Sequence, residues 1–197
     1  MKMILGLSAL LLLTVGCNKI EGTLNLTEAV KLKSTKGVVR TIKPQSYSAD
    51  IKLKSKKSIT LRLENDSDEK YEFKIPSNKP IPNNGDFAFS ANEVGQPVDL
   101  TGSVKTSVTR SDTVTGWESC QYQDWQTVCN SGPDGRPICT TVPVTRTGQQ
   151  FVRYYIETIE KDVLMTIKAQ GSEVSSGDFV GDIAYSNKVY TEQWGCR

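Results

Sequence analysis

The most regular pattern in this chain is an alternation of apolar and polar residues. Every second side chain is apolar in residues 51–54 and 59–63, and again in 71–75. A period of two places these side chains on one face of a β-strand and the polar ones on the other. Turn-forming residues at 65–69 separate the last two stretches, so residues 58–75 are predicted to form a β-hairpin.

The same pattern predicts further strands. Residues 22–33 have apolar side chains on one parity, interrupted at Glu28, and strands also begin at Phe87 and within 98–115. Residues 151–169 alternate on either side of Glu160-Lys161-Asp162, which predicts a hairpin that turns there. A helical stripe through 156, 159, 163 and 167 is the alternative, but β-branched and aromatic residues favour strands.

A second hairpin is predicted near the C-terminus. Residues 117–129 and 138–155 flank 130–137, which is rich in glycine, proline and other turn formers. Pairing about a centre near Asp134 places Cys129 opposite Cys139. A Cys129–Cys139 disulfide would therefore close this hairpin and leave Cys120 to pair with Cys196. In the chain-entropy model, the two bridges stabilise by about 2.8 and 4.5 kcal/mol respectively.

These elements predict an all-β fold, either an antiparallel β-sandwich or two small tandem β units linked by disulfides. The expected organisation of the β part is an N-terminal β region at 22–110 and a C-terminal disulfide-containing β region at 111–197. The tripeptide Gly-Asp-Phe occurs at both 85–87 and 177–179, which leaves an internal duplication open.

The N-terminus carries the one targeting signal that the sequence shows. Lys2 precedes an apolar run at 4–15, a pattern typical of a secretory signal. That run is shorter than the roughly 20 residues that span a bilayer. The stretch Leu13-Thr14-Val15-Gly16-Cys17 resembles the lipobox of bacterial lipoproteins, although Thr14 stands where the pattern prefers leucine. The resemblance implies cleavage before Cys17, which makes residues 1–16 a signal peptide. It also implies a diacylglyceryl group on the Cys17 sulfur, which makes residues 17–21 a lipidated tether. Asn18 and Lys19, rather than aspartate, favour the outer membrane if the bacterium is Gram-negative.

Composition narrows the range of partners. Without residues 1–16 the chain has 181 residues (197 − 16), with 23 Lys and Arg (24 less Lys2) against 22 Asp and Glu, a net charge of +1. Such a balance does not indicate nucleic acid as a partner. The four cysteines beyond Cys17 could in principle bind zinc, but their spacings match no zinc finger and the chain has no histidine. Two disulfides are the better interpretation for an exported protein, and no metal or cofactor is expected.

Three clusters of side chains are candidate sites. The basic stretch 31–57 could contact anionic head groups, although alternation alone would place its lysines on a solvated face. The acidic residues Glu64, Asp66, Asp68, Glu69 and Glu72 offer oxygen ligands for calcium but lack the arrangement of an EF-hand. Aromatic residues of the C-terminal half could form a platform for a glycan or a peptide, but packing in a core or against the disulfides is the primary expectation. They are Trp117, Tyr122, Trp125, Tyr154, Tyr155, Tyr185, Tyr190 and Trp194.

The sequence does not indicate an enzyme. Without histidine, Ser-His and Cys-His nucleophile systems are excluded, and no nucleotide-binding or hydrolase motif occurs. The leading hypothesis is a membrane-anchored lipoprotein with a binding or structural role in the cell envelope, contacting a protein partner through an exposed strand edge. The alternatives are a lipoprotein that binds glycan or lipid with its C-terminal aromatics, and a hydrolase that uses carboxylates alone.

Overall fold

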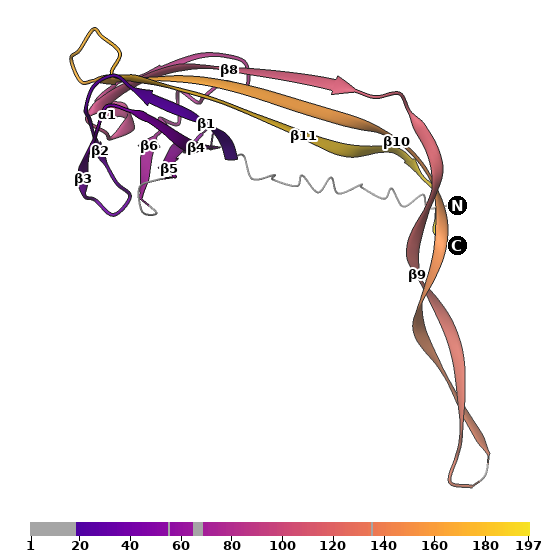
Figure 1. Ribbon diagram of the computed structural model, residues 1–197. Helices are drawn as coiled ribbons and strands as arrows, with labels where there is room; N and C mark the ends of the chain where they lie inside the picture. The colour runs from indigo at the N-terminus through magenta and orange to yellow at the C-terminus, as the bar shows by residue number, and fades with distance from the viewer. Residues whose placement is uncertain (1–18, 55, 65–68, 135) are drawn as a thin grey trace. The chain divides into compact units, whose positions relative to one another are not determined.

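The computed structural model describes residues 19–54, 56–64, 69–134 and 136–197. Within them it has eleven strands and a single short helix, α1 (Ala91–Val94) (Figure 1). The all-β, disulfide-linked fold predicted from the alternation is thereby confirmed. The strands are β1 (Lys19–Leu26), β2 (Val30–Lys33), β3 (Val39–Ile42), β4 (Ser46–Lys54), β5 (Ser58–Leu63), β6 (Lys70–Lys74), β7 (Gly85–Phe89), β8 (Val98–Arg110), β9 (Val114–Ser131), β10 (Pro137–Ala169) and β11 (Gly177–Gln193).

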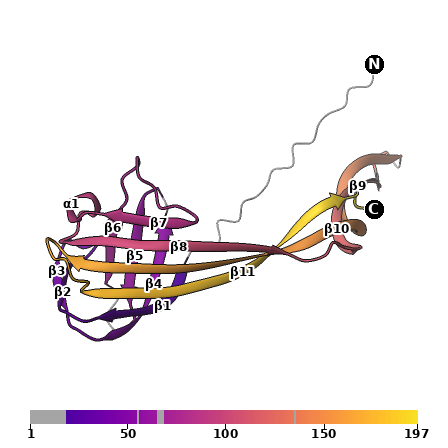
Figure 2. The ribbon, with the colours of Figure 1, turned by 90° about the horizontal axis from the view of Figure 1, so that it is seen from above.

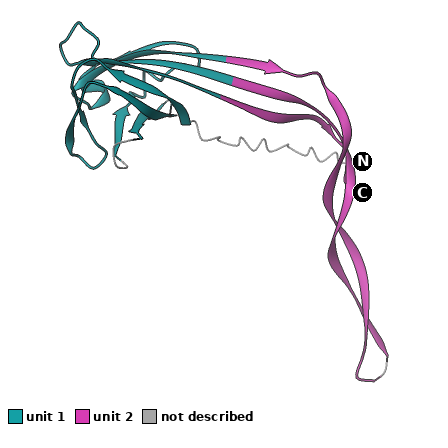
Figure 3. Cartoon of the chain, viewed as in Figure 1, with its two compact units in different colours: residues 1–106, 160–183 teal, residues 107–159, 184–197 magenta. Residues whose placement is uncertain are grey.

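The chain divides into two compact units, each made of segments that are distant in sequence (Figure 3). Unit 1 comprises residues 1–106 and 160–183, and unit 2 comprises residues 107–159 and 184–197. Residues 111–197, grouped by sequence as one C-terminal region, therefore contribute to both units. The reason is that β10 and β11 are long enough for each to supply residues to both.

Nine strands form one curled antiparallel sheet, and β2 and β3 form a small second sheet. The order in the large sheet is β6-β5-β4-β1-β11-β10-β8-β7, and β9 pairs with β10. Within unit 1, Figure 2 shows β4, β5 and β6 running across the direction of β8 and β11. The curl turns one face of the sheet inward, so alternate residues of every strand in unit 1 can reach a shared core.

The core of unit 1 consists of the apolar residues that alternate along its strands. Ile51 and Leu53 of β4 lie beside Ile59 and Leu61 of β5, and all are buried. The hairpin predicted at 58–75 is confirmed, because β5 and β6 pair with Leu61 opposite Tyr71. Most of its turn, residues 65–68, lies outside the described residues.

The hairpin predicted to turn at Glu160-Lys161-Asp162 is wrong, because β10 continues through these residues without a break. Asp162 is a residue that turns favour, but no glycine or proline accompanies it. In the sheet, β10 lies between β11 and β8, so strand pairing on both sides holds this segment extended. A cluster of charges was therefore an insufficient turn signal.

The C-terminal hairpin has the register that the sequence predicts. β9 and β10 pair from Val114 opposite Tyr154 to Ser131 opposite Pro137, with Cys129 directly opposite Cys139. The structure contains the disulfides Cys129–Cys139 and Cys120–Cys196, the same two pairs that follow from the sequence. Both belong to unit 2, where Val152 is the one buried apolar side chain among the described residues.

Candidate functional site

Residues 194–197 are bound along β10 in unit 2, which places Trp194 beside the hairpin. The backbone N–H of Trp194 donates to the carbonyl oxygen of Phe151 at 3.0 Å, and the N–H of Gln149 donates to that of Arg197 at 2.8 Å. A Cβ atom on Gly148 would collide with the Arg197 carbonyl oxygen, so glycine is required for this close approach. The Cys120–Cys196 disulfide ties the same segment covalently to β9.

This attachment completes a row of three aromatic side chains, which we call the aromatic row. The ring of Phe151 in β10 lies 5.7 Å from that of Trp117 in β9 and 5.3 Å from that of Trp194, measured between centroids. The three rings line a cleft of about 450 Å³ together with Gln149, Gly195 and Arg197. Trp117 and Trp194 remain 66% and 63% exposed, so their ring surfaces are available to a ligand.

The aromatic row belongs to a longer face of the hairpin that carries no charged side chain. From Trp117 to Ser131 every second residue of β9, and each residue opposite it in β10, is aromatic, amide, hydroxyl, cysteine or proline. All of these residues except Phe151 are exposed, and we call this surface the uncharged face. Its members are Trp117, Ser119, Gln121, Gln123, Trp125, Thr127, Cys129 and Ser131, with Phe151, Gln149, Thr147, Thr145, Pro143, Thr141, Cys139 and Pro137 opposite.

Between the pairs Trp117–Phe151 and Ser131–Pro137, the charged residues of β9 and β10 lie on the alternate positions, which point to the other face. There Arg146 forms an ion pair with Asp124 at 2.8 Å. Glu118 forms an ion pair with Lys188 and accepts a hydrogen bond of 2.9 Å from the hydroxyl group of Tyr190. The Lys188 ammonium group lies 3.7 Å from the ring centroid of Tyr154, a cation–π distance. The opposite face of the two strands carries no charge of its own over this stretch, and Arg197 of the adjoining segment is the one charged residue in the lining of its cleft.

The pKa values of Glu118 and Lys188 predict how the stability contributed by their ion pair depends on pH. The hydrogen bond from Lys188, followed by that from Tyr190, lowers the pKa of Glu118 below its ordinary value of 4.5. The stability that this carboxylate contributes is therefore present above pH 4.5 and lost as the pH falls through the lowered pKa. The pKa of Lys188 is raised from 10.5, mainly by the hydrogen bond to Glu118, so its contribution is present below 10.5 and lost as the pH rises through the raised value.

We expect the carboxyl carbon of Glu118 to titrate in an NMR experiment with a midpoint below 4.5. The Lys188→Met variant should move that midpoint upward, because the main donor is removed. Lys161→Met, which removes a lysine of unit 1, should leave it unchanged. A midpoint at or above 4.5 in the unaltered protein would show that the ion pair does not persist in solution.

The expectation that the C-terminal aromatics fill a core is wrong for the three tryptophans. Trp117, Trp125 and Trp194 are 66%, 67% and 63% exposed. The physical reason is that the described residues of unit 2 provide no apolar core to receive them. Exposed apolar side chains of this size indicate a contact surface.

The structure does not bring the acidic residues of the calcium candidate together, and it does not describe the predicted lipidation residue. Cys17, Asp66 and Asp68 lie outside the described residues, so lipidation of Cys17 stays a prediction. Of the remaining acids in the calcium candidate, Glu69 pairs with Arg40 at 3.2 Å and Glu64 accepts a hydrogen bond from Ser48. The described residues contain no group of three or more acidic or cysteine side chains placed to hold a metal ion.

The uncharged face could have been recognised in the sequence but was not. Its signal is that positions 117, 119, 121, 123, 125 and 127 all lack charge, whereas Glu118 and Asp124 occupy the alternate parity. The contribution of Trp194 had no local signal, because it depends on a hydrogen bond to Phe151, a residue 43 positions away (194 − 151).

No protein-family model matches the chain, and comparisons with curated proteins and with solved structures find no significant similarity. Among the described residues, no helix has the length and apolar character needed to cross a bilayer. What the geometry defines is therefore a class alone: an all-β, disulfide-linked protein with an exposed, uncharged aromatic surface.

Proposed function

We propose that this chain is an exported bacterial lipoprotein, anchored to a membrane by lipid on Cys17, that works by binding in the cell envelope. The anchor is inferred from the lipobox resemblance at 13–17, and the outer membrane is favoured in a Gram-negative bacterium. The observation that supports binding is the uncharged face of unit 2, where large apolar and hydrogen-bonding side chains are exposed together.

The outer edge of β9 offers a partner a second kind of contact. In the described part of the chain, β9 pairs with β10 alone, so its other edge has free backbone groups. Natural proteins usually protect such an edge with lysine or proline, and β9 contains neither in its eighteen residues. An extended segment of a partner could add to this edge while its side chains lie on the uncharged face.

The anchor is tested by growing the bacterium with labelled palmitate. We expect label in the unaltered chain and none after Cys17→Ser. The mass of the mature protein should match a chain that begins at Cys17.

The binding surface is tested by a photoreactive amino acid at Gln123, on the uncharged face, with Gln126 on the opposite face as the matched position. A discrete cross-linked product from 123 and not from 126 is expected, and equal products from both would contradict the proposal.

A neutral glycan is the second candidate ligand, favoured by the cleft at the aromatic row. Sugar rings have apolar faces that stack on indole rings, and their hydroxyl groups bond to amides such as that of Gln149 in the cleft lining. If the ligand is a glycan, Trp117→Ala should weaken its binding by about tenfold. Trp125→Ala, on the same face but outside the cleft lining, should weaken it much less.

A further inference from the structure

A second hollow lies in unit 1, on the outer surface of β1, β4, β5 and β6. It is a cleft of about 480 Å³ lined by Lys19, Asp50, Lys52, Lys54, Thr60, Arg62 and Lys70, and we call it the basic cleft. Its lining carries five cationic side chains and one carboxylate. These residues alternate with the buried ones on the same strands, such as Ile51 and Leu61, so they share the outward face of the sheet.

The strand register brings like charges directly together in this cleft. Lys19 of β1 is opposite Lys52 of β4, and Arg62 of β5 is opposite Lys70 of β6. Like charges directly opposite each other across a sheet are destabilising. An anion bound in the cleft would offset this repulsion.

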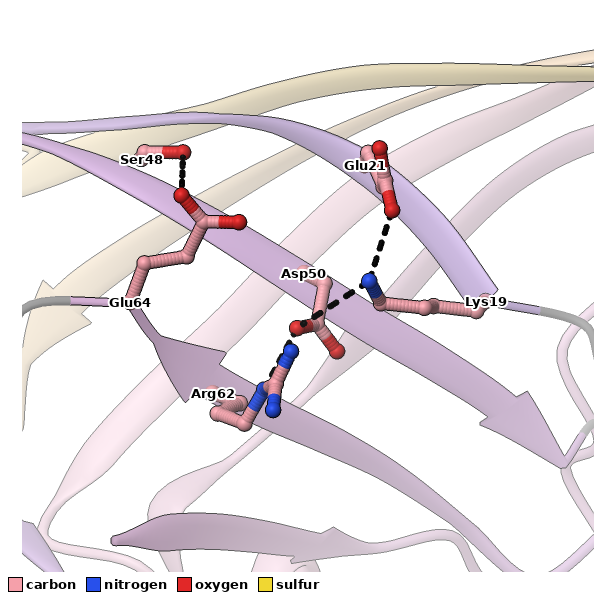
Figure 4. A network of polar contacts seen from close by, with 6 residues as sticks. All are labelled: Lys19, Glu21, Ser48, Asp50, Arg62 and Glu64. Carbon is pink, nitrogen blue, oxygen red and sulfur yellow. Dashed lines mark hydrogen bonds and ion pairs between the residues drawn. The ribbon is translucent and has the colours of Figure 1, made fainter. Parts of the chain in front are cut away.

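Asp50 pairs with two of the five cationic side chains of the basic cleft, Lys19 and Arg62. Its carboxylate, only 5% exposed, accepts a hydrogen bond of 2.6 Å from Arg62 and lies 3.8 Å from the Lys19 ammonium group (Figure 4). Lys19 also bonds Glu21 at 2.6 Å, which raises the pKa of Lys19 and keeps it charged at neutral pH. Within the described residues, by contrast, no acidic side chain pairs with the ammonium groups of Lys52, Lys54 and Lys70, which are exposed.

The basic cleft is also close in sequence to Cys17, the residue predicted to carry the lipid anchor. Lys19 follows Cys17 by two residues, and two residues of chain span about 7 Å at most. If Cys17 carries lipid, as the proposed function holds, the basic cleft lies at the level of the head groups. Each lysine or arginine near an anionic surface then contributes about 1 kcal/mol.

We propose that the basic cleft binds the phosphate of an anionic phospholipid in the membrane that holds the anchor, through Lys52, Lys54 and Lys70. Arg62, oriented by Asp50, lies opposite Lys70 across β5 and β6 and completes the positive lining. The lipid-bound cleft fixes which side of unit 1 faces the membrane, which the covalent anchor alone does not do.

The test is amine-reactive footprinting of the anchored protein in vesicles, read by mass spectrometry. Vesicles of phosphatidylcholine are compared with vesicles that also contain phosphatidylglycerol. We expect the labelling rates of Lys52, Lys54 and Lys70 to fall about fivefold in the anionic vesicles, the factor that corresponds to about 1 kcal/mol for each residue. Lys31, Lys33 and Lys36, exposed lysines of unit 1 outside the cleft lining, are the matched set and should keep their rates.

An equal fall for both sets, or no fall at all, would overturn the proposal. Inorganic phosphate added to pure phosphatidylcholine vesicles separates the two sources of the anion: if it protects the three cleft lysines as well as the anionic lipid does, the assignment to lipid is overturned. Failure of the anchor is seen separately, because a chain without lipid on Cys17 would not float with vesicles of pure phosphatidylcholine, which offer the basic cleft no anionic lipid.

Discussion

Replacing Phe179 by alanine should lower the free energy of unfolding of unit 1 by about 3–5 kcal/mol, the range for removing a buried phenyl ring. Phe179 of β11 is fully buried, opposite Leu24 of β1. Its ring covers two glycines that face each other across these strands, Gly22 and Gly181. A Cβ atom on either would lie less than 3.0 Å from the ring, so the phenyl group occupies the space that their side chains would fill.

The loss should fall at the upper end of that range because the cavity cannot be refilled. Neither Gly22 nor Gly181 has a side chain that could move into the space, and relaxation of neighbours is what usually reduces such costs. Urea denaturation followed by circular dichroism measures the change. Val180→Ala, a 56% exposed neighbour on the same strand, should change the free energy by less than about 0.5 kcal/mol. Equal effects of the two substitutions would show that β1 and β11 do not pack around the ring.

Removing the Cys120–Cys196 disulfide should have the largest effect on unit 2. The bridge joins residues 76 positions apart, and closing a loop of that length stabilises by about 4.5 kcal/mol in the chain-entropy model. Because unit 2 has only Val152 as a buried apolar side chain among its described residues, little packing is available to compensate. The Cys120→Ser/Cys196→Ser variant should therefore release residues 194–197 from β10 and take Trp194 out of the aromatic row.

Hydrogen exchange read by mass spectrometry checks this expectation. The amides of Gln149 and Arg197, which donate to each other's carbonyl oxygens, should lose about two-thousandfold in protection, the factor that corresponds to about 4.5 kcal/mol. The matched control is Cys129→Ser/Cys139→Ser, which removes a bridge between residues only 10 positions apart. That bridge contributes about 2.8 kcal/mol in the same model. Retained protection at Gln149 in the first variant would mean that backbone pairing alone holds the segment.

The same variant links the fold to the proposed binding function. If a ligand occupies the cleft at the aromatic row, loss of the disulfide should weaken binding nearly as much as Trp194→Ala, because both remove the third ring. The basic cleft of unit 1 should be unaffected, since none of its lining residues belongs to unit 2. The two surfaces can therefore be altered independently.

The sequence by itself determined the features that depend on neighbouring residues. The period of two identified the buried parity of β4, β5 and β6, and the turn at 130–137 set the register of β9 and β10, which placed Cys129 opposite Cys139. Both follow from local geometry, because alternate side chains of a strand point to opposite faces and a short turn determines which residues meet.

Only the tertiary structure decided which faces are covered and which distant segments meet. The alternation of side chains does not show whether a strand face with Trp117 and Trp125 is buried, because burial depends on whether another layer packs on that face. The continuation of β10 through 160–162 depends on its pairing with β8 and β11, and the basic cleft depends on Lys19 meeting Lys52 across β1 and β4. These contacts join residues far apart in the chain, so no local pattern encodes them.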